Sequence, residues 1–218
     1  MYNLNGELTG VKNRLCGKTL LVIGDSFVEG HTLSESQTWA YKLADRNGMT
    51  CINKGINGAS IAYSANEQYT SIVESIASII NSVSSADYVV VLAGHNDANA
   101  DLHGGTAIPI GNDDDAANTT YKGALNIIID ALLDAYPTAH ILLCAPFNRR
   151  GIEEDYAAAM ETMAGIYSVP FFDSYHRSTI CFQNTAQNTT YELENTLHLN
   201  EAGHERFSYI IDAQLQKI

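Results

Sequence analysis

The sequence predicts a single α/β domain in which a five-stranded, mostly parallel sheet lies between two layers of helices. Five short apolar runs alternate along the chain with helix-like segments, which is the order typical of a three-layer sheet protein. The runs are continuously apolar, as expected for parallel strands that are covered on both faces. No linker, repeat or low-complexity tract divides the 218 residues. We therefore expect residues 18–218 to form one domain and residues 1–17 an N-terminal extension.

The elements follow from apolar runs and from the signals that end them. The strands are expected at Thr19–Ile23, Thr50–Asn53, Tyr88–Leu92, His140–Cys144 and Val169–Phe172. The helices are expected within residues 38–48, 66–83, 119–137, 153–167 and 200–216. Gly48 is a natural C-cap for the first helix and Pro137 stops the third. Isoleucines from Ile72 to Ile80 recur at helical spacing in the second.

Composition narrows the possible partners. The chain has 12 Lys and Arg against 25 Asp and Glu, so its net charge is −13. An acidic surface repels phosphate backbones and anionic lipids, so we expect neither a nucleic-acid nor a membrane partner. No apolar run reaches the roughly 18 residues of a membrane span, and the N-terminus lacks a signal-peptide core. We expect a cytoplasmic protein, or one exported without an ordinary leader.

Polar residues follow four of the predicted strands. Ligands of parallel sheets bind beyond the carboxyl ends of the strands, so these residues are expected to meet at one edge. They are Ser26, Gly58, Asn96 and His198. A serine hydroxyl needs a neighbouring base before it attacks a carbonyl, and His198 is mostly neutral at pH 7. The backbone N–H groups of Ser26 and Gly58 and the Asn96 amide are candidate donors to the resulting oxyanion.

The order of these motifs resembles that of the SGNH hydrolases, also called the GDSL family. The four blocks are Gly24-Asp25-Ser26, Asn53 to Gly58, Gly94-His95-Asn96-Asp97 and His198 within "HLNEAGH". The resemblance implies a flavodoxin-like three-layer fold and ester hydrolysis without a cofactor. It also implies Ser26 as nucleophile, His198 as base, and Gly58 and Asn96 as oxyanion donors. Ser26 is not in a G-x-S-x-G motif, which argues against the α/β-hydrolase fold.

One position departs from the family pattern. The family places an aspartate three residues before the histidine, where this chain has Asn195. That acid normally orients the imidazole and stabilises its charged form. Glu194 could take its place, a backbone carbonyl near residues 195–196 could hold the imidazole in a Ser-His dyad, or the enzyme could be slow or inactive. We favour the dyad, because a carbonyl also fixes the tautomer.

Other motifs carry less weight. The histidines and aspartates of "HNDANADLH" could in principle gather a cation, but loops this polar are more often solvated, and we expect no metal. The four cysteines are widely spaced and predict no disulfide framework. The loop 99–118 has one short apolar cluster, Ala107 to Ile110, followed by acids. Such a loop offers little surface to a long acyl chain.

These features predict a serine esterase for short acyl groups, acetyl above all, on a sugar or another polar carrier. A small-molecule or glycan ester is thus the expected partner. The alternatives are a catalytically degenerate carbohydrate-binding protein and a lipase or acyl thioesterase.

Overall fold

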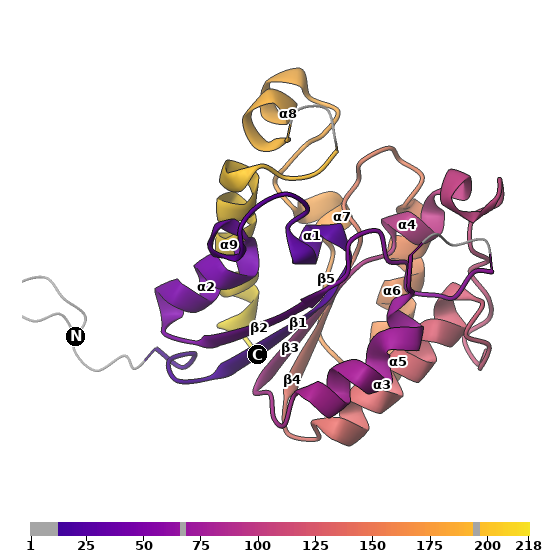
Figure 1. Ribbon diagram of the computed structural model, residues 1–218, viewed down its shortest axis with the longest axis horizontal. Coiled ribbons are helices and arrows are strands. Elements are labelled where there is room, and N and C mark those ends of the chain that lie inside the picture. Colours follow the sequence, from indigo (N-terminus) through magenta and orange to yellow (C-terminus); the bar gives the residue numbers. More distant parts are fainter. Residues whose placement is uncertain (1–12, 66–68, 194–196) are drawn as a thin grey trace, which may run out of the picture.

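The computed structural model describes residues 13–65, 69–193 and 197–218, which form a three-layer α/β/α fold (Figure 1). Five strands make one sheet in the order β2-β1-β3-β4-β5, and every neighbouring pair is parallel. The strands are β1 (Thr19–Gly24), β2 (Thr50–Gly55), β3 (Tyr88–Leu92), β4 (His140–Cys144) and β5 (Phe171–Phe172). The predicted fold class and five-stranded parallel sheet are confirmed.

Helices cover both faces of the sheet. The longer ones are α2 (Trp39–Asn47), α3 (Ile72–Ser82), α5 (Tyr121–Ala135), α6 (Glu154–Tyr167) and α9 (Glu201–Leu215). Helices α3, α5 and α6 pack on one face, and α2 and α9 pack on the other (Figure 1). Side chains of successive strand residues point to opposite faces. Leu21 and Ile23 therefore lie in the α3/α5/α6 core, while Leu20 and Val22 lie in the α2/α9 core.

The helix ends follow the local sequence signals. Helix α2 ends at Gly48, which adopts a left-handed φ of 67°. The Thr120 side chain caps α5 by accepting from the Gly123 N–H. Strand β5 begins two residues later than the predicted start at Val169, because Pro170 has no N–H to donate to the sheet.

The described end of the N-terminal segment packs on the domain. Leu15 is fully buried in the α2/α9 core. The Asn13 side chain donates to the Asn47 side chain at 2.8 Å, and the Gly17 N–H donates to the Gly48 carbonyl at 2.9 Å. Residues that the sequence assigned to an extension thus contribute to the core.

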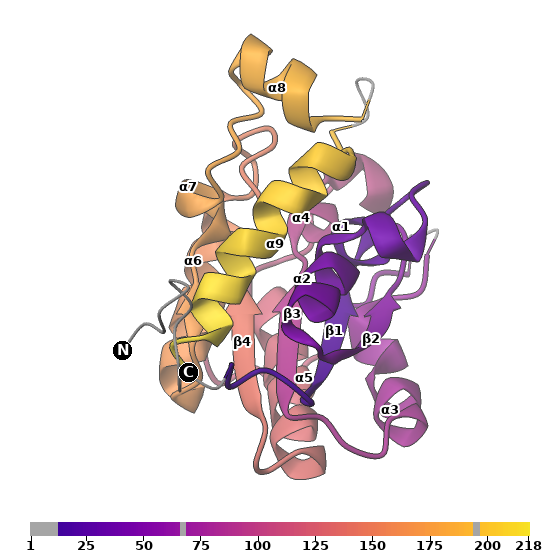
Figure 2. The ribbon, with the colours of Figure 1, turned by 90° about the vertical axis from the view of Figure 1, so that its left-hand side faces the viewer.

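Short helices at the carboxyl ends of the strands were not predicted. They are α1 (Ser26–Glu29), α4 (His95–Ala98), α7 (Ser174–Arg177) and α8 (Thr185–Tyr191), with 3₁₀ turns at Glu35–Gln37 and Ala100–His103. Helices α1 and α4 and the start of α9 lie above the strand ends (Figure 2). All four cysteines are free. Within the described ranges no helix has the length and apolar character needed to cross a membrane.

Candidate active site

The Gly24-Asp25-Ser26 turn joins β1 directly to α1, and each of its residues has a separate role. A Cβ atom at Gly24 would lie 2.1 Å from the carbonyl oxygen of Leu92, so only glycine allows β1 and β3 to come this close. Asp25 is the N-cap of α1, and its carboxyl accepts a hydrogen bond from the Phe27 N–H at 2.9 Å. Ser26 is the first residue of the helix, so its own N–H has no partner within α1.

The structure brings His198 against Ser26 across 172 positions of sequence. The His198 Nε2 atom lies 2.8 Å from the Ser26 Oγ atom, within hydrogen-bond distance. The Ser26 residue is 3% exposed. A hydroxyl held in this way can pass its proton to the imidazole as it attacks an electrophile.

The segment that carries His198 is tied to the end of α8. The Leu193 N–H donates to the His198 carbonyl at 2.8 Å, and Glu192 and Leu199 form an antiparallel bridge. The Glu192 carboxylate accepts from the Leu197 N–H at 2.6 Å. Leu197 has a positive φ of 60°, which is rare for leucine and is held by these contacts. Helix α8 thus fixes the backbone on both sides of the imidazole.

Gly58 and Asn96 follow β2 and β3, which are the two neighbours of β1 in the sheet. Gly58 has a left-handed φ of 77°, and a Cβ atom there would lie 2.5 Å from the Tyr69 ring. The Asn96 Nδ2 atom donates one hydrogen bond to the Ala59 carbonyl at 2.8 Å. A side-chain amide has two N–H donors, so one remains for another acceptor.

Hydrogen bonds of Asp97 hold the Gly58 and Asn96 loops together. The Asp97 carboxylate accepts from the backbone N–H groups of Ile61 and Ala62 at 2.8 Å and 3.0 Å. The His103 Nε2 atom lies 2.8 Å from the Asn96 carbonyl oxygen. The Asp97 contacts connect the loops after β2 and β3, and the His103 contact holds the backbone of Asn96 within the loop after β3.

Three of the four possible metal ligands in "HNDANADLH" are engaged in different contacts. Asp97 binds backbone amides, His103 contacts the Asn96 carbonyl, and His95 lies beside Asp25. In the part of the chain that the structure describes, no three His, Cys, Asp or Glu side chains are placed to hold a metal ion.

Asn195 and Glu194, the two side chains considered for the third position of the site, lie outside the described residues. The carboxylate of Asp173, which follows β5, contacts a different histidine. It accepts from the His176 N–H at 3.1 Å and lies 2.9 Å from the His176 ring nitrogen.

Sequence reasoning missed two side chains near the serine. The imidazole of His31 stacks on that of His198, and Arg149 lies with its guanidinium carbon 5.3 Å from the centre of the Phe27 ring. His31 stands only five residues after Ser26, but its left-handed backbone conformation has no signal in the sequence. Arg149 follows β4 at the same edge, so the strand-end rule used for the other residues could have identified it.

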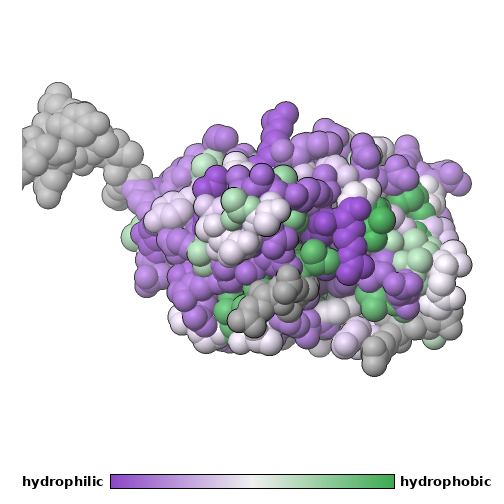
Figure 3. Space-filling view, turned by 90° about the horizontal axis from the view of Figure 1, so that it is seen from above, coloured by the Kyte–Doolittle hydropathy of each residue, from purple (hydrophilic) through white to green (hydrophobic). Residues whose placement is uncertain are grey.

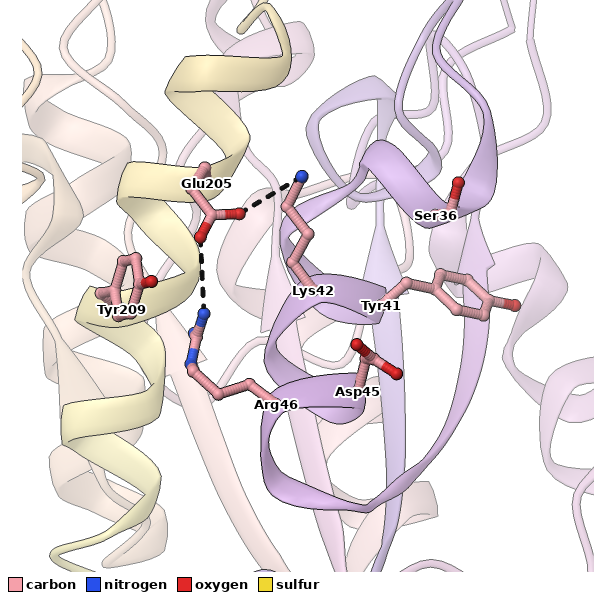
Figure 4. A pocket seen from close by; sticks show the side chains of 7 residues that line it. All are labelled: Ser36, Tyr41, Lys42, Asp45, Arg46, Glu205 and Tyr209. Carbon is pink, nitrogen blue, oxygen red and sulfur yellow. Dashed lines mark ion pairs between the residues drawn. The ribbon is translucent and has the colours of Figure 1, made fainter.

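A separate cavity of about 590 Å³ lies between α2 and α9 (Figure 4). The Glu205 carboxylate pairs with Lys42 at 3.2 Å and with Arg46 at 3.7 Å, and the Arg46 guanidinium lies over the Tyr209 ring. None of the four predicted site residues lines this cavity. The ion pairs of Glu205 with Lys42 and Arg46 join the two helices across the cavity.

Solved structures show that the whole fold recurs in other proteins. A protein from Lactobacillus plantarum is 25% identical with a TM-score of 0.79, over 94% of this chain and 99% of that one. Est24, a carbohydrate acetylesterase from Sinorhizobium meliloti, is 15% identical with a TM-score of 0.67, over 91% and 98% of the two chains. The aryl esterase of M. smegmatis is 16% identical with a TM-score of 0.69, over 92% and 99%. Likeness at 15% and 16% identity concerns the fold alone.

A search of curated proteins gave no match. The model of the GDSL-like Lipase/Acylhydrolase family matches residues 22–206, from β1 into α9, and so includes all four blocks of the site. With the serine–histidine contact at the strand ends, this match shows that the chain belongs to the GDSL-like lipase/acylhydrolase family of hydrolases.

Proposed function

We propose that the protein is a serine ester hydrolase in which Ser26 is the nucleophile and His198 the general base. The observation that carries the proposal is the 2.8 Å contact between the His198 Nε2 and Ser26 Oγ atoms. The contact lies at the carboxyl edge of a parallel sheet, where ligands of such folds bind. The family match and the esterases among the similar folds support this chemistry.

The reaction follows from the positions of these groups. Ser26 Oγ attacks the ester carbonyl while its proton moves to His198 Nε2. The negative charge on the carbonyl oxygen is stabilised by the Ser26 N–H, the Gly58 N–H and the second Asn96 N–H. The imidazolium then gives its proton to the leaving alcohol, and an acyl-enzyme remains. Water, activated by the same imidazole, releases the acid and restores the hydroxyl.

We further propose that His198 works in a dyad, with its second nitrogen held by a backbone carbonyl near residues 195–196. The support is the asparagine at position 195, which can offer only a neutral oxygen. A carbonyl acceptor keeps the proton on Nδ1 and so leaves Nε2 free to accept the serine proton.

The proposed substrates are short acyl esters, acetyl above all, on a sugar or another polar carrier. The largest buried side chain of the loop 99–118 packs into the protein, while Ala107 and Pro109 line a small cavity of about 330 Å³. Ile108 is 4% exposed and belongs to the α3/α5/α6 core, and the Tyr156 hydroxyl donates to its carbonyl. The side toward which the strands point is mostly hydrophilic, with apolar residues in small patches (Figure 3). The carbohydrate acetylesterase among the similar folds adds support.

The nucleophile is tested by p-nitrophenyl acetate hydrolysis with wild type, Ser26→Ala and the exposed control Ser36→Ala. We expect Ser26→Ala to lose at least 99% of kcat, on the order of the loss known for other serine hydrolases, while Ser36→Ala keeps the wild-type rate. A fluorophosphonate should label the wild type stoichiometrically and Ser26→Ala not at all. Equal turnover by wild type and Ser26→Ala would refute the proposal.

The binding-only alternative makes the opposite prediction. A degenerate carbohydrate-binding protein would bind glycans but would not react with the fluorophosphonate. The formed Ser26–His198 contact favours the hydrolase, because a binding protein has no need to keep a base against a buried hydroxyl.

A further inference from the structure

The imidazole of His198 is packed against a second imidazole. The rings of His31 and His198 lie parallel, with 4.0 Å between their centres and 2° between their planes. The Phe27 ring also packs on His198, at 5.5 Å and 28°. The base that contacts Ser26 is therefore held by aromatic rings as well as by its hydrogen bond.

The chain adopts a costly backbone conformation to place His31. Helix α1 ends at Gly30, which has a φ of 104°, and His31 follows with a φ of 58°. The Leu33 N–H closes this turn on the Gly30 carbonyl at 3.0 Å. A left-handed conformation is unfavourable for a residue other than glycine, and it is kept where the surrounding structure fixes it.

The polar atoms of His31 do not explain its position. Its Nδ1 atom is buried and has no hydrogen-bond partner among the described residues. The well-defined contact of the side chain is instead the face of its ring against the His198 ring.

We propose that His31 is a positioning residue for the general base, and that its ring face stabilises His198 when that imidazole becomes charged. Stacking fixes the plane of the base, so Nε2 stays directed at Ser26 Oγ. A cation over the face of an aromatic ring is attracted to its electrons, so the face of the His31 ring favours the imidazolium formed during the reaction. In a full triad a carboxylate performs both tasks, and this chain has Asn195 at the family's aspartate position. The inference rests on the proposed esterase function.

Two substitutions separate stacking from ordinary packing. His31→Phe keeps a flat ring and removes the nitrogens. His31→Asn removes the ring, and asparagine tolerates the left-handed conformation better than most residues, so backbone strain is not added. The control is His176→Asn, which changes an exposed histidine that pairs with Asp173 and has no ring contact with His198.

We expect His31→Asn to lower kcat for p-nitrophenyl acetate about tenfold, which corresponds to about 1.4 kcal/mol of barrier. KM should change less than twofold, because the ring acts on the base and not on the bound ester. His31→Phe should recover kcat to within about threefold of wild type, and His176→Asn should match wild type. Melting temperatures of all four proteins identify any loss that comes from unfolding.

Two further measurements distinguish failure of this inference from failure of the esterase proposal. The rate of fluorophosphonate labelling of Ser26 requires an activated serine but no natural ester, and it should fall in His31→Asn as kcat does. A crystal structure of His31→Asn should show the His198 ring rotated, or in more than one conformer. The inference would be overturned if His31→Asn kept the wild-type kcat and labelling rate. It would also be overturned if the kcat of His31→Phe were as low as that of His31→Asn. Failure of the wild type to react with the fluorophosphonate would overturn both proposals, whereas labelling without ester turnover would refute only the esterase.

Discussion

The Asp25 Oδ2 atom lies 3.4 Å from the His95 Nε2 atom in a pair that is almost completely shielded from water. Burial raises the pKa of Asp25 to about 8, although its bond to the Phe27 N–H and the charge of Arg149 oppose the rise. Burial also lowers the pKa of His95 well below its ordinary value. Near pH 7 the fold therefore favours the neutral forms of both residues, and Asp25 directly precedes Ser26 in the chain.

Asp25 should make the protein less stable as the pH rises. The raised pKa means that the folded state holds a proton between about pH 4 and pH 8, which the unfolded chain has released. The contribution of Asp25 to the free energy of unfolding is fully present below pH 4 and is lost as the pH rises toward 8. The loss is at most about 1.4 kcal/mol per pH unit. Asp25→Asn removes the titration but keeps an N-cap side chain, so its free energy of unfolding should fall less steeply with pH.

Urea unfolding at pH 5, 6 and 7 measures both slopes. The control is Asp114→Asn, which changes an exposed carboxylate and should keep the wild-type slope. A slope in Asp25→Asn as steep as in wild type would show that Asp25 does not carry the proton.

Asn96 should act on the transition state more than on the bound substrate. Its amide has one donor committed to the Ala59 carbonyl and one left for the oxyanion. Asn96→Ala should therefore lower kcat by about 10²–10³, the usual effect of removing one such donor, with little change in KM. Exposed Asn112→Ala is the control. A tenfold rise in KM with kcat intact would instead make Asn96 a substrate-binding residue.

Gly58 should resist substitution for two independent reasons. Its φ of 77° is unfavourable for alanine, and the new Cβ would lie 2.5 Å from the Tyr69 ring. We expect Gly58→Ala to cost about 1–3 kcal/mol of stability and to lower kcat by displacing the oxyanion donor. The Tyr69→Ala background removes the clash but leaves the strained φ. The loss of stability caused by Gly58→Ala should therefore be smaller in that background than in wild type, but it should not vanish. If Gly58→Ala caused no loss of stability in the Tyr69→Ala background, the tyrosine ring alone would be the reason that position 58 requires a glycine.

The sequence predicted the sheet and its site for a physical reason. Continuous apolar runs identified parallel strands, and parallel strands bring their carboxyl ends to one edge. The rule that ligands bind at this edge therefore selected Ser26 and His198, which the structure places in contact. The apolar runs do not reveal the order of the strands in the sheet, because nothing in the sequence of β1 shows that it lies between β2 and β3.

The missed features depend on tertiary contacts. Helix α1 has only four residues, too few for a helical repeat in the sequence. The stacking of His31 depends on a left-handed φ that the surrounding turn imposes on a residue other than glycine. The buried pairing of Asp25 with His95 joins two blocks that the sequence shows only as separate motifs.

Position 195 offers a direct test of the proposed dyad. If a backbone carbonyl holds the imidazole, the asparagine side chain is not required and Asn195→Ala should keep kcat within about threefold of wild type. Asn195→Asp should raise kcat, by about tenfold if it gains 1.4 kcal/mol, because a carboxylate stabilises the imidazolium. Initial rates at saturating p-nitrophenyl acetate compare the variants. Glu194→Gln is the decisive control, since a hundredfold loss there would make Glu194 the third member and contradict the dyad.

Acyl-chain length should distinguish an esterase for small groups from a lipase. Each CH₂ group buried in an apolar groove contributes about 0.8 kcal/mol, which would raise kcat/KM about fourfold per carbon. The loop 99–118 packs Ile108 into the protein core, and the cavity beside it, of about 330 Å³, is too small for a long acyl chain together with its carrier. We therefore expect kcat/KM to be highest for the acetyl ester and to fall through butyryl, octanoyl and palmitoyl esters. Acetylated xylan and acetylated monosaccharides, assayed in parallel by acetate release, should be cleaved if the carrier is a sugar. A steady rise in kcat/KM toward palmitoyl would contradict the proposal, because it requires an apolar acyl groove beside Ser26.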